Sequence, residues 1–259
     1  MGKHSVVEVY NLSKNFGGVT ATNDVSFQLN RGEILGLIGP NGAGKTTLLN
    51  LLTGFIKPTK GKILFQGKDV TGRKPFELAR QGLVRTFQMT MVYKESTAEE
   101  NVLMGRHFKT EGGFWPAILN SKKMRAREHQ AQTRASELLE LFGLKDFLHE
   151  KAGNLAYGHQ KALGLAVAMA ADPVCLLLDE PAAGMNPEET RWLTGLIRKI
   201  NAQGVSILLV EHDMPMVMSL SHNVIVINYG EKICEGTPKE VQGNQEVIRA
   251  YLGDESEST

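Results

Sequence analysis

The sequence predicts an α/β fold: a mostly parallel sheet with an N-terminal antiparallel β subdomain and an inserted α-helical subdomain. Three observations support this fold class. Apolar and polar residues alternate from Val6 to Phe27, which is typical of antiparallel strands joined by a turn. An apolar run at 33–38 leads through a glycine-rich turn into a segment of helical character at 46–52. Three later runs are continuously apolar and β-branched, as expected of strands buried on both faces of a parallel sheet, at 174–178, 205–210 and 223–228.

Length and composition indicate one enlarged domain over residues 1–259. Hydrophobic residues make up 42% of the chain and charged residues 22%, a balance typical of a folded globular protein. The formal net charge is +1, so no global field draws the chain to nucleic acid or anionic lipid. Two cysteines, Cys175 and Cys234, are too few for a disulfide scaffold and favour a reducing compartment. No apolar stretch reaches the roughly 20 residues that span a bilayer.

Changes in composition divide this domain into four parts. Residues 1–88 hold the β subdomain and the first part of the core. Between Gln88 and Gly158 the composition shifts toward Glu, Lys, Arg, Ala and Leu, and apolar residues recur at helical spacing. We therefore expect a helical subdomain over residues 89–160, with the core continuing over 161–240. The C-terminal segment is 241–259, and we expect its acidic end at 254–259 to be disordered.

A glycine-rich motif between the first core strand and its helix predicts a phosphate site. Residues 39–46 fit G-x-x-x-x-G-K-[ST] in the strand and helix context that this motif requires. Its glycines let backbone N–H groups approach phosphate oxygens, and the helix N-terminus adds its dipole. We expect Lys45 to neutralise the β- and γ-phosphates, Thr46 to bind Mg²⁺ and Thr47 to contact the α-phosphate. The motif predicts a P-loop nucleotide triphosphatase or kinase core, with a phosphate loop of Gly39, Pro40, Asn41, Gly42, Ala43, Gly44, Lys45, Thr46 and Thr47.

Two carboxylates at the end of the apolar run 174–178 predict the chemistry beside this loop. Asp179 suits the Mg²⁺ shell, because Mg²⁺ in proteins is held by one or two carboxylates together with phosphates and water. Glu180 is then free to polarise an attacking water as a general base. The pair favours hydrolysis of a nucleoside triphosphate.

With these motifs, almost the whole chain resembles the ATP-binding cassette family, and the resemblance implies roles for three further residues. Phe16, 29 positions before Lys45, matches the aromatic residue that stacks on adenine in this family. Gln88 matches the glutamine that senses Mg²⁺ and water. His212, 32 positions after Glu180, matches the histidine that contacts the γ-phosphate and holds the water and the glutamate. The resemblance thus implies ATP and Mg²⁺ as ligands, with Glu180, His212 and Gln88 catalytic and Thr46, Gln88 and Asp179 at the metal.

The signature segment of the family, usually Leu-Ser-Gly-Gly-Gln, is altered here. Residues 155–159 read Leu-Ala-Tyr-Gly-His, so Ala156 lacks the serine hydroxyl that donates to the γ-phosphate of a partner's ATP. The backbone of Ala156, Tyr157 and Gly158 and the helix that follows remain for that contact. Asn186 stands where the family usually has an aspartate. Because each motif occurs once, the resemblance implies a second ATPase chain, identical or different, that completes each ATP site.

Within the family, several segments look like the ATPases of branched-chain amino-acid importers. These are Val84 to Gln88, the long insert after residues 101–105, the altered signature, and the ending at 235–238 and 247–253. The resemblance implies integral-membrane permease partners, an indirect link to an extracellular or periplasmic solute-binding protein, and a peripheral place on the cytoplasmic face of the inner or plasma membrane. ATPases of urea uptake and of lipopolysaccharide export remain alternatives.

Two other classes are less compatible with the sequence. Non-transport ATP-binding cassette proteins of ribosomes or DNA commonly carry two cassettes or a long coiled-coil insert, and this near-neutral chain has neither, so we expect no nucleic-acid partner. A GTPase-type switch would carry Asn-Lys-x-Asp to read guanine, which does not occur here.

Overall fold

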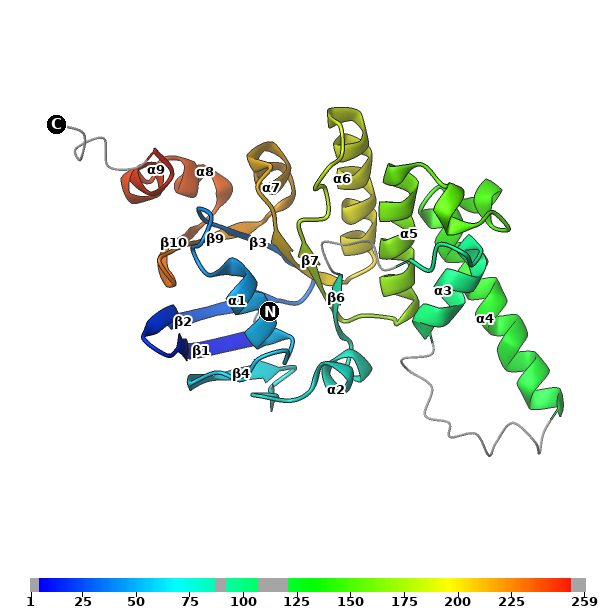
Figure 1. Cartoon of the computed structure of the whole chain (residues 1–259), viewed down its shortest axis with the longest axis horizontal. Coiled ribbons are helices and arrows are strands. Elements are labelled where there is room, and N and C mark those ends of the chain that lie inside the picture. The colour runs from blue at the N-terminus through cyan, green and yellow to red at the C-terminus, as the bar shows by residue number, and fades with distance from the viewer. Residues whose placement is uncertain (1–4, 87–91, 107–120, 253–259) are drawn as a thin grey trace.

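The computed structural model describes residues 5–86, 92–106 and 121–252, apart from the side chains of 121–128 and 252. A central six-stranded sheet organises the molecule, in the order β10-β9-β3-β8-β7-β6 (Figure 1). The five strands from β9 to β6 pair in parallel, and β10 pairs antiparallel with β9 at the edge. The strands are β3 (Ile34–Ile38), β6 (Leu83–Thr86), β7 (Cys175–Asp179), β8 (Ser206–Val210), β9 (Asn223–Asn228) and β10 (Glu231–Gly236).

A second, antiparallel sheet lies below the first in Figure 1 and has the order β2-β1-β4-β5. Its strands are β1 (Ser5–Phe16), β2 (Val19–Asn30), β4 (Lys60–Phe65) and β5 (Lys68–Asp69). Helix α1 (Lys45–Leu52) lies between the two sheets, and its leucines share one buried cluster with apolar residues of both. The short helix α2 (Pro75–Arg80) connects this region to β6.

Helices α5, α6 and α7 pack on the opposite face of the central sheet, whereas α3 and α4 pack mainly on α5 and on each other. Alternate residues of β7, such as Leu176 and Leu178, point into this second core, while Cys175 and Leu177 point into the first. Helices α3, α4 and α5 gather at one end of the molecule, and α8 and α9 at the other (Figure 1). The bounds are α3 (Ala98–Arg106), α4 (Ser121–Leu141), α5 (Tyr157–Ala170), α6 (Pro187–Ala202), α7 (Met214–Leu220), α8 (Pro238–Gln242) and α9 (Gln245–Leu252), with 3-10 turns η3 (Lys145–Phe147) and η4 (Ala152–Asn154).

The structure matches the predicted strands closely and adds elements that the sequence did not predict. The predicted run at 174–178 forms β7 one residue later in the chain, the run at 205–210 forms β8 with its start one residue later, and the run at 223–228 is β9. The hairpin β4–β5 and the edge strand β10 were not predicted, because they are partly exposed and rich in charged residues. The strand β6 was not predicted because it has only four residues. Helix α5 runs from Tyr157 to Ala170 and therefore crosses residue 160, the predicted end of the helical subdomain. The predicted boundaries between the four parts of the chain stay predictions. The acidic end at 254–259 lies outside the described residues.

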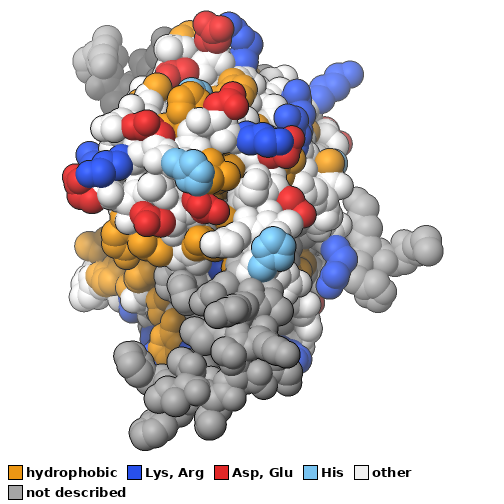
Figure 2. Space-filling view, turned by 90° about the vertical axis from the view of Figure 1, so that its right-hand side faces the viewer, with side chains coloured by type: hydrophobic (Ala, Val, Ile, Leu, Met, Phe, Trp, Pro, Cys, Tyr) orange, Lys and Arg blue, Asp and Glu red, His pale blue; other side chains and the backbone are white. Residues whose placement is uncertain are grey.

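Figure 2 views the helical end of the molecule, where charged and hydrophobic side chains are interspersed over the upper part and hydrophobic side chains gather in a patch at the left below them. Within the described ranges, no helix combines the length and the apolar character needed to cross a membrane.

Candidate functional site

Three neighbouring parallel strands deliver the candidate residues to one edge of the central sheet. The carboxyl end of β3 leads into the glycine-rich loop, that of β7 into Asp179 and Glu180, and that of β8 into Glu211 and His212. Residues Leu37, Val210 and Asp179 are aligned in register across these strands. Ligands of open α/β sheets bind outside the carboxyl ends of the strands, and this edge therefore holds the candidate site.

The glycines of the predicted phosphate loop are required by its geometry. Gly44 caps α1 with φ of +102°, and a Cβ there would lie 2.5 Å from the carbonyl oxygen of Ala21. At Gly39, a Cβ would meet the carbonyl oxygen of Ile227. Gly42 has φ of +82° and faces open space. The backbone can thus turn its N–H groups toward a bound anion, as the motif predicts.

Lys45 lies against this loop with only 7% of its surface exposed. Its Nζ donates to the carbonyl oxygens of Gly39 at 2.6 Å and Pro40 at 2.9 Å. Burial lowers the pKa of Lys45, while Glu180 and Asp179 oppose that shift electrostatically. Both carboxylates therefore act on the same ammonium, and the three charged groups that the sequence singled out are brought together.

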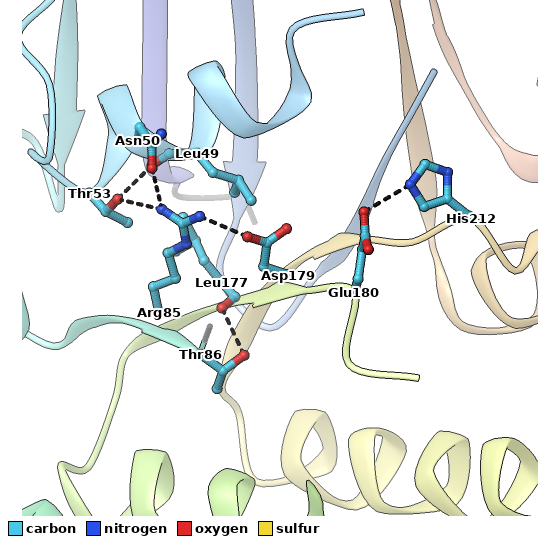
Figure 3. Close-up of polar contacts among 9 residues, drawn as sticks. All are labelled: Leu49, Asn50, Thr53, Arg85, Thr86, Leu177, Asp179, Glu180 and His212. Atoms are coloured by element: carbon cyan, nitrogen blue, oxygen red, sulfur yellow. Dashed lines mark hydrogen bonds and ion pairs between the residues drawn. The ribbon is translucent and has the colours of Figure 1, made fainter. Parts of the chain in front are cut away.

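Glu180 and His212 form the second predicted pair. The Nε2 atom of His212 lies 2.8 Å from Oε1 of Glu180, and Figure 3 shows the two side chains pointing toward each other from different strands. Glu180 has φ of +47°, and its N–H donates to the carbonyl oxygen of Val210 at 2.8 Å. A positive φ is uncommon for a glutamate, and such local strain is concentrated at functional sites.

Asp179 points in another direction, toward Arg85 on β6 (Figure 3). An Nη2 atom of Arg85 lies 2.7 Å from Oδ2 of Asp179, and both side chains are buried. The sequence analysis did not single out Arg85 as a site residue. The feature that could have pointed to Arg85 is that it is the one charged residue of the short strand β6, which pairs with β7.

Glu211 is a second site residue that the sequence analysis missed. Its Oε1 accepts from the N–H of Ala182 at 2.6 Å and its Oε2 from the N–H of His212 at 3.0 Å. Burial raises the pKa of Glu211, and backbone N–H groups of Ala182, His212 and Asp213 oppose that shift. One buried carboxylate thus ties the turn after Glu180 to the turn that carries His212. The signal was an acid directly after the apolar strand β8.

The altered signature segment forms the start of α5. Ala156 is the N-cap residue and makes no side-chain cap hydrogen bond, as expected from its missing hydroxyl. The hydroxyl of Tyr157 donates to the carbonyl oxygen of Ala183 at 3.0 Å, which joins this segment to the turn after Glu180. A Cβ at Gly158 would lie 3.1 Å from Oε1 of Glu189.

The remaining predicted residues are placed as follows. Phe16 ends β1 with a half-exposed ring, over which the Nζ of Lys14 lies 5.0 Å from the centroid. Thr46 is exposed and Thr47 half-buried in the first turn of α1. Asn186 caps α6 by accepting from the N–H groups of Glu188 and Glu189, both at 3.0 Å. Gln88 lies outside the described residues.

The donor set fits Mg²⁺ that is shared with a phosphate ligand. Among the side chains that the structure describes, no group of three or more His, Cys, Asp and Glu could hold a metal ion. Asp179 and the hydroxyl of Thr46 are hard oxygen donors beside a phosphate loop, and Mg²⁺ is commonly held by one or two protein oxygens plus phosphates and water. The residues present therefore fit Mg²⁺ bound together with a nucleotide.

A cavity of about 560 Å³ lies between α2, β6, α3 and α5, and Arg85 is one of its lining residues. Its walls are mainly apolar and include Phe55, Phe76, Tyr93 and Met104, all of which are exposed. Contiguous exposed apolar surface of this kind is uncommon in a monomer and marks interaction sites.

Comparisons with known proteins agree with this geometry. The family model of the ABC transporter matches residues 22–183, and that of the branched-chain amino acid ATP-binding cassette transporter matches residues 231–257. The chain is 43% identical to the high-affinity branched-chain amino acid transport ATP-binding protein BraF of Pseudomonas aeruginosa, covering 96% of this chain and 98% of that protein. It is 44% identical to the corresponding protein LivG of Escherichia coli K12, with the same coverage.

A solved structure supports the same assignment at the level of the fold. The crystal structure of an ATP-binding cassette of an ABC transporter in its ADP conformation matches with a TM-score of 0.84 and 31% identity, covering 96% of this chain and 99% of that one. The predicted fold class is confirmed. The chain therefore belongs to the ATP-binding cassette family, as an ATP-binding subunit of an ABC transporter that couples ATP hydrolysis to transport.

Proposed function

We propose that this chain energises the import of branched-chain or closely related amino acids, from the cytoplasmic face of the inner or plasma membrane. The observation that carries the proposal is the similarity over nearly the whole chain to BraF and LivG, together with the match of residues 231–257. The same similarity favours amino acids over urea uptake or lipopolysaccharide export. A solute-binding protein outside the membrane would deliver the solute to the permease.

The site residues divide the work of hydrolysis between them. The loop from Gly39 to Thr47 would hold the phosphates, Phe16 would stack on adenine, and Thr46, Asp179 and Gln88 would hold Mg²⁺. When bound, Mg²⁺ would neutralise charge on the β- and γ-phosphate oxygens. The Nζ of Lys45 now donates to the carbonyl oxygens of Gly39 and Pro40. When nucleotide binds, it would donate to phosphate oxygens in their place.

Glu180 would take a proton from the attacking water. The hydrogen bond with His212 supports this role, because it fixes the carboxylate at the end of β7, beside the phosphate loop. The tie from Glu211 to both turns supports the pair from behind.

A second ATPase chain would complete each site. The N-terminal turn of α5, with Ala156, Tyr157 and Gly158, would face the ATP of the partner, where its backbone N–H groups suit an anion. The second chain can be a copy of this one or a different subunit.

Permease subunits would dock at the cavity between α2 and α3. Its exposed aromatic side chains suit an apolar element of a membrane protein. Arg85 both lines this cavity and forms the ion pair with Asp179. Movement at the cavity can therefore reach the ATP site through β6 and β7.

A co-purification experiment tests the proposal. Phe76 lines the cavity and is 52% exposed, whereas Tyr229 is 86% exposed and does not line it. We expect tagged wild type and Tyr229→Glu to recover the same permease subunits from detergent extracts, and Phe76→Glu to lose them. In the reconstituted complex, leucine with its solute-binding protein should stimulate ATP hydrolysis. Recovery of ribosomes, or stimulation by another class of solute alone, would contradict the proposal.

A further inference from the structure

The Arg85 side chain is paired with Asp179, the carboxylate proposed to hold Mg²⁺. Its Nη2 lies 2.7 Å from Oδ2 of Asp179, and the two side chains are only 6% and 11% exposed. A guanidinium stays protonated at all accessible pH values, so a full positive charge lies permanently against this carboxylate.

The position of this charge is fixed from the opposite side by α1. Figure 3 shows the guanidinium between Asp179 and the C-terminal part of α1. Its Nη1 donates to Oδ1 of Asn50 at 2.7 Å and lies 3.4 Å from Oγ1 of Thr53, whose hydroxyl donates to the carbonyl oxygen of Leu49 at 2.6 Å. Two anchors on one element and one on another leave the side chain little freedom.

A divalent cation held by Asp179 must share this carboxylate with Arg85. Two positive charges at one buried carboxylate repel each other strongly, because the low local dielectric screens them weakly. Losing the guanidinium would also free the Asp179 side chain, but an aspartate has only two side-chain torsions, so we expect the charge effect to be larger.

We propose that Arg85 is a positioning residue that serves as the counter-charge of Asp179 and thereby sets the Mg²⁺ concentration at which nucleotide is bound. This inference rests on the proposed function, in which Asp179 is a metal ligand. Arg85 keeps the buried carboxylate neutralised by the protein itself, and Mg²⁺ binds only when its attraction to the carboxylate and phosphates exceeds its repulsion from the guanidinium.

The test measures Mg²⁺-dependent binding and not turnover. Binding of a non-hydrolysable ATP analogue to the full chain is titrated calorimetrically from excess EDTA to millimolar Mg²⁺. We expect Arg85→Gln to reach half-maximal binding at about tenfold lower Mg²⁺ than wild type. Arg85→Lys keeps the charge and should stay near wild type. Arg198→Gln is the matched control, since it removes an exposed guanidinium that bonds to the carbonyl oxygen of Ser219.

Thermal unfolding supplies an independent readout. Removing one partner of a buried ion pair leaves an uncompensated charge, so Arg85→Gln should unfold at least about 5 °C below wild type in EDTA. Mg²⁺ with the analogue should raise its midpoint by more than it raises that of wild type, since the metal supplies the missing counter-charge. If the role of Arg85 were merely structural, Arg85→Gln would lower the unfolding midpoint by the same amount in EDTA and in Mg²⁺ with the analogue.

The outcomes are distinguishable. If wild type binds the analogue equally well with and without Mg²⁺, the proposed metal site fails. If wild type depends on Mg²⁺ and Arg85→Gln needs the same or a higher concentration, this inference alone is overturned. Should Arg85→Gln not fold, Asn50→Asp draws the guanidinium toward α1 and should also lower the Mg²⁺ requirement. An unchanged requirement in that variant would overturn the inference too.

Discussion

Glu180 is a candidate catalytic residue in a strained backbone conformation. Its φ of +47° turns the chain immediately after β7, so that Asp179 faces Arg85 while Glu180 faces His212. Glycine would adopt this conformation at lower cost, but it has no carboxylate. The hydrogen bonds to Val210 and His212 hold the strained residue in place.

Gly44 allows a direct test of the phosphate loop. We expect Gly44→Ala to abolish ATP binding and to lower the free energy of unfolding by about 1–3 kcal/mol, because its Cβ would collide with the Ala21 carbonyl at a φ of +102°. The matched control is Gly67→Ala, which has φ of +74°, open space around its Cβ and a position remote from the loop. It should lose stability and keep the ATP affinity. Calorimetric titration and urea denaturation measure both quantities, and equal ATP affinity in the two variants would contradict the loop assignment.

Glu211 predicts a specific pH dependence of stability. Burial raises its pKa in the folded chain above the ordinary value of 4.5, so its contribution is full below pH 4.5 and is lost as pH rises through the raised pKa. Glu211→Gln has no such loss. The free energy of unfolding of the variant minus that of wild type should therefore increase with pH across this window, as measured by urea denaturation at a series of pH values.

Glu240 is the control with the opposite sign. Hydrogen bonds from the side chain and backbone of Thr237 lower the pKa of Glu240 below 4.5. Its contribution is present above pH 4.5 and is lost as pH falls through the lowered pKa, so the same difference for Glu240→Gln should decrease as pH rises through that window. The interpretation of Glu211 is wrong if both differences change in the same direction.

At the scale of elements, the neighbouring helices α5 and α6 differ in how their N-termini are capped. Helix α6 begins with a capping box, in which Asn186 accepts two N–H groups and Glu189 accepts the N–H of Asn186. Helix α5 begins at Tyr157, and its N-cap residue Ala156 has a non-helical backbone (φ −56°, ψ 151°), as N-cap residues do, but no side-chain acceptor. The N–H groups of its first turn thus receive no side-chain acceptor from the N-cap residue.

Because Ala156 provides no side-chain cap for α5, a serine at this position should stabilise the helix. Ala156→Ser should raise the free energy of unfolding by about 1 kcal/mol, while Asn186→Ala should lower it by a similar amount. Denaturation of the two variants and the double variant measures these changes. A loss of stability in Ala156→Ser would show that the N-terminus of α5 is not capped as its backbone indicates.

At the scale of the whole molecule, the sequence predicted the parallel core, the β subdomain and most residues of the candidate site, for identifiable reasons. The loop at 39–47 and the acids after β7 carry local motifs, and the spacing of His212 carries the family resemblance. Arg85 and Glu211 could not be found in this way, because each acts through contacts between strands that only the sheet order brings together. The strands β6 and β5 were missed because four- and two-residue strands show no periodicity, and β4 because half of its six residues are exposed and two of them are lysines.

The molecule links two surfaces through its central sheet. The candidate ATP site lies at the carboxyl edge of β3, β7 and β8, and the apolar cavity lies beside β6 at the end of the same sheet. Between them lies the buried pair of Arg85 and Asp179. This arrangement supports a subunit in which hydrolysis at one surface is coupled to movement at the other.

The most direct test of this account is ATP hydrolysis by the purified chain, measured together with ATP binding. Glu180→Gln keeps the shape of the side chain and removes the base, so we expect hydrolysis to fall by at least about a hundredfold while ATP affinity stays near wild type. Lys45→Ala should instead lose the binding itself. Hydrolysis by Glu180→Gln at the wild-type rate, in the presence of Mg²⁺, would contradict the account.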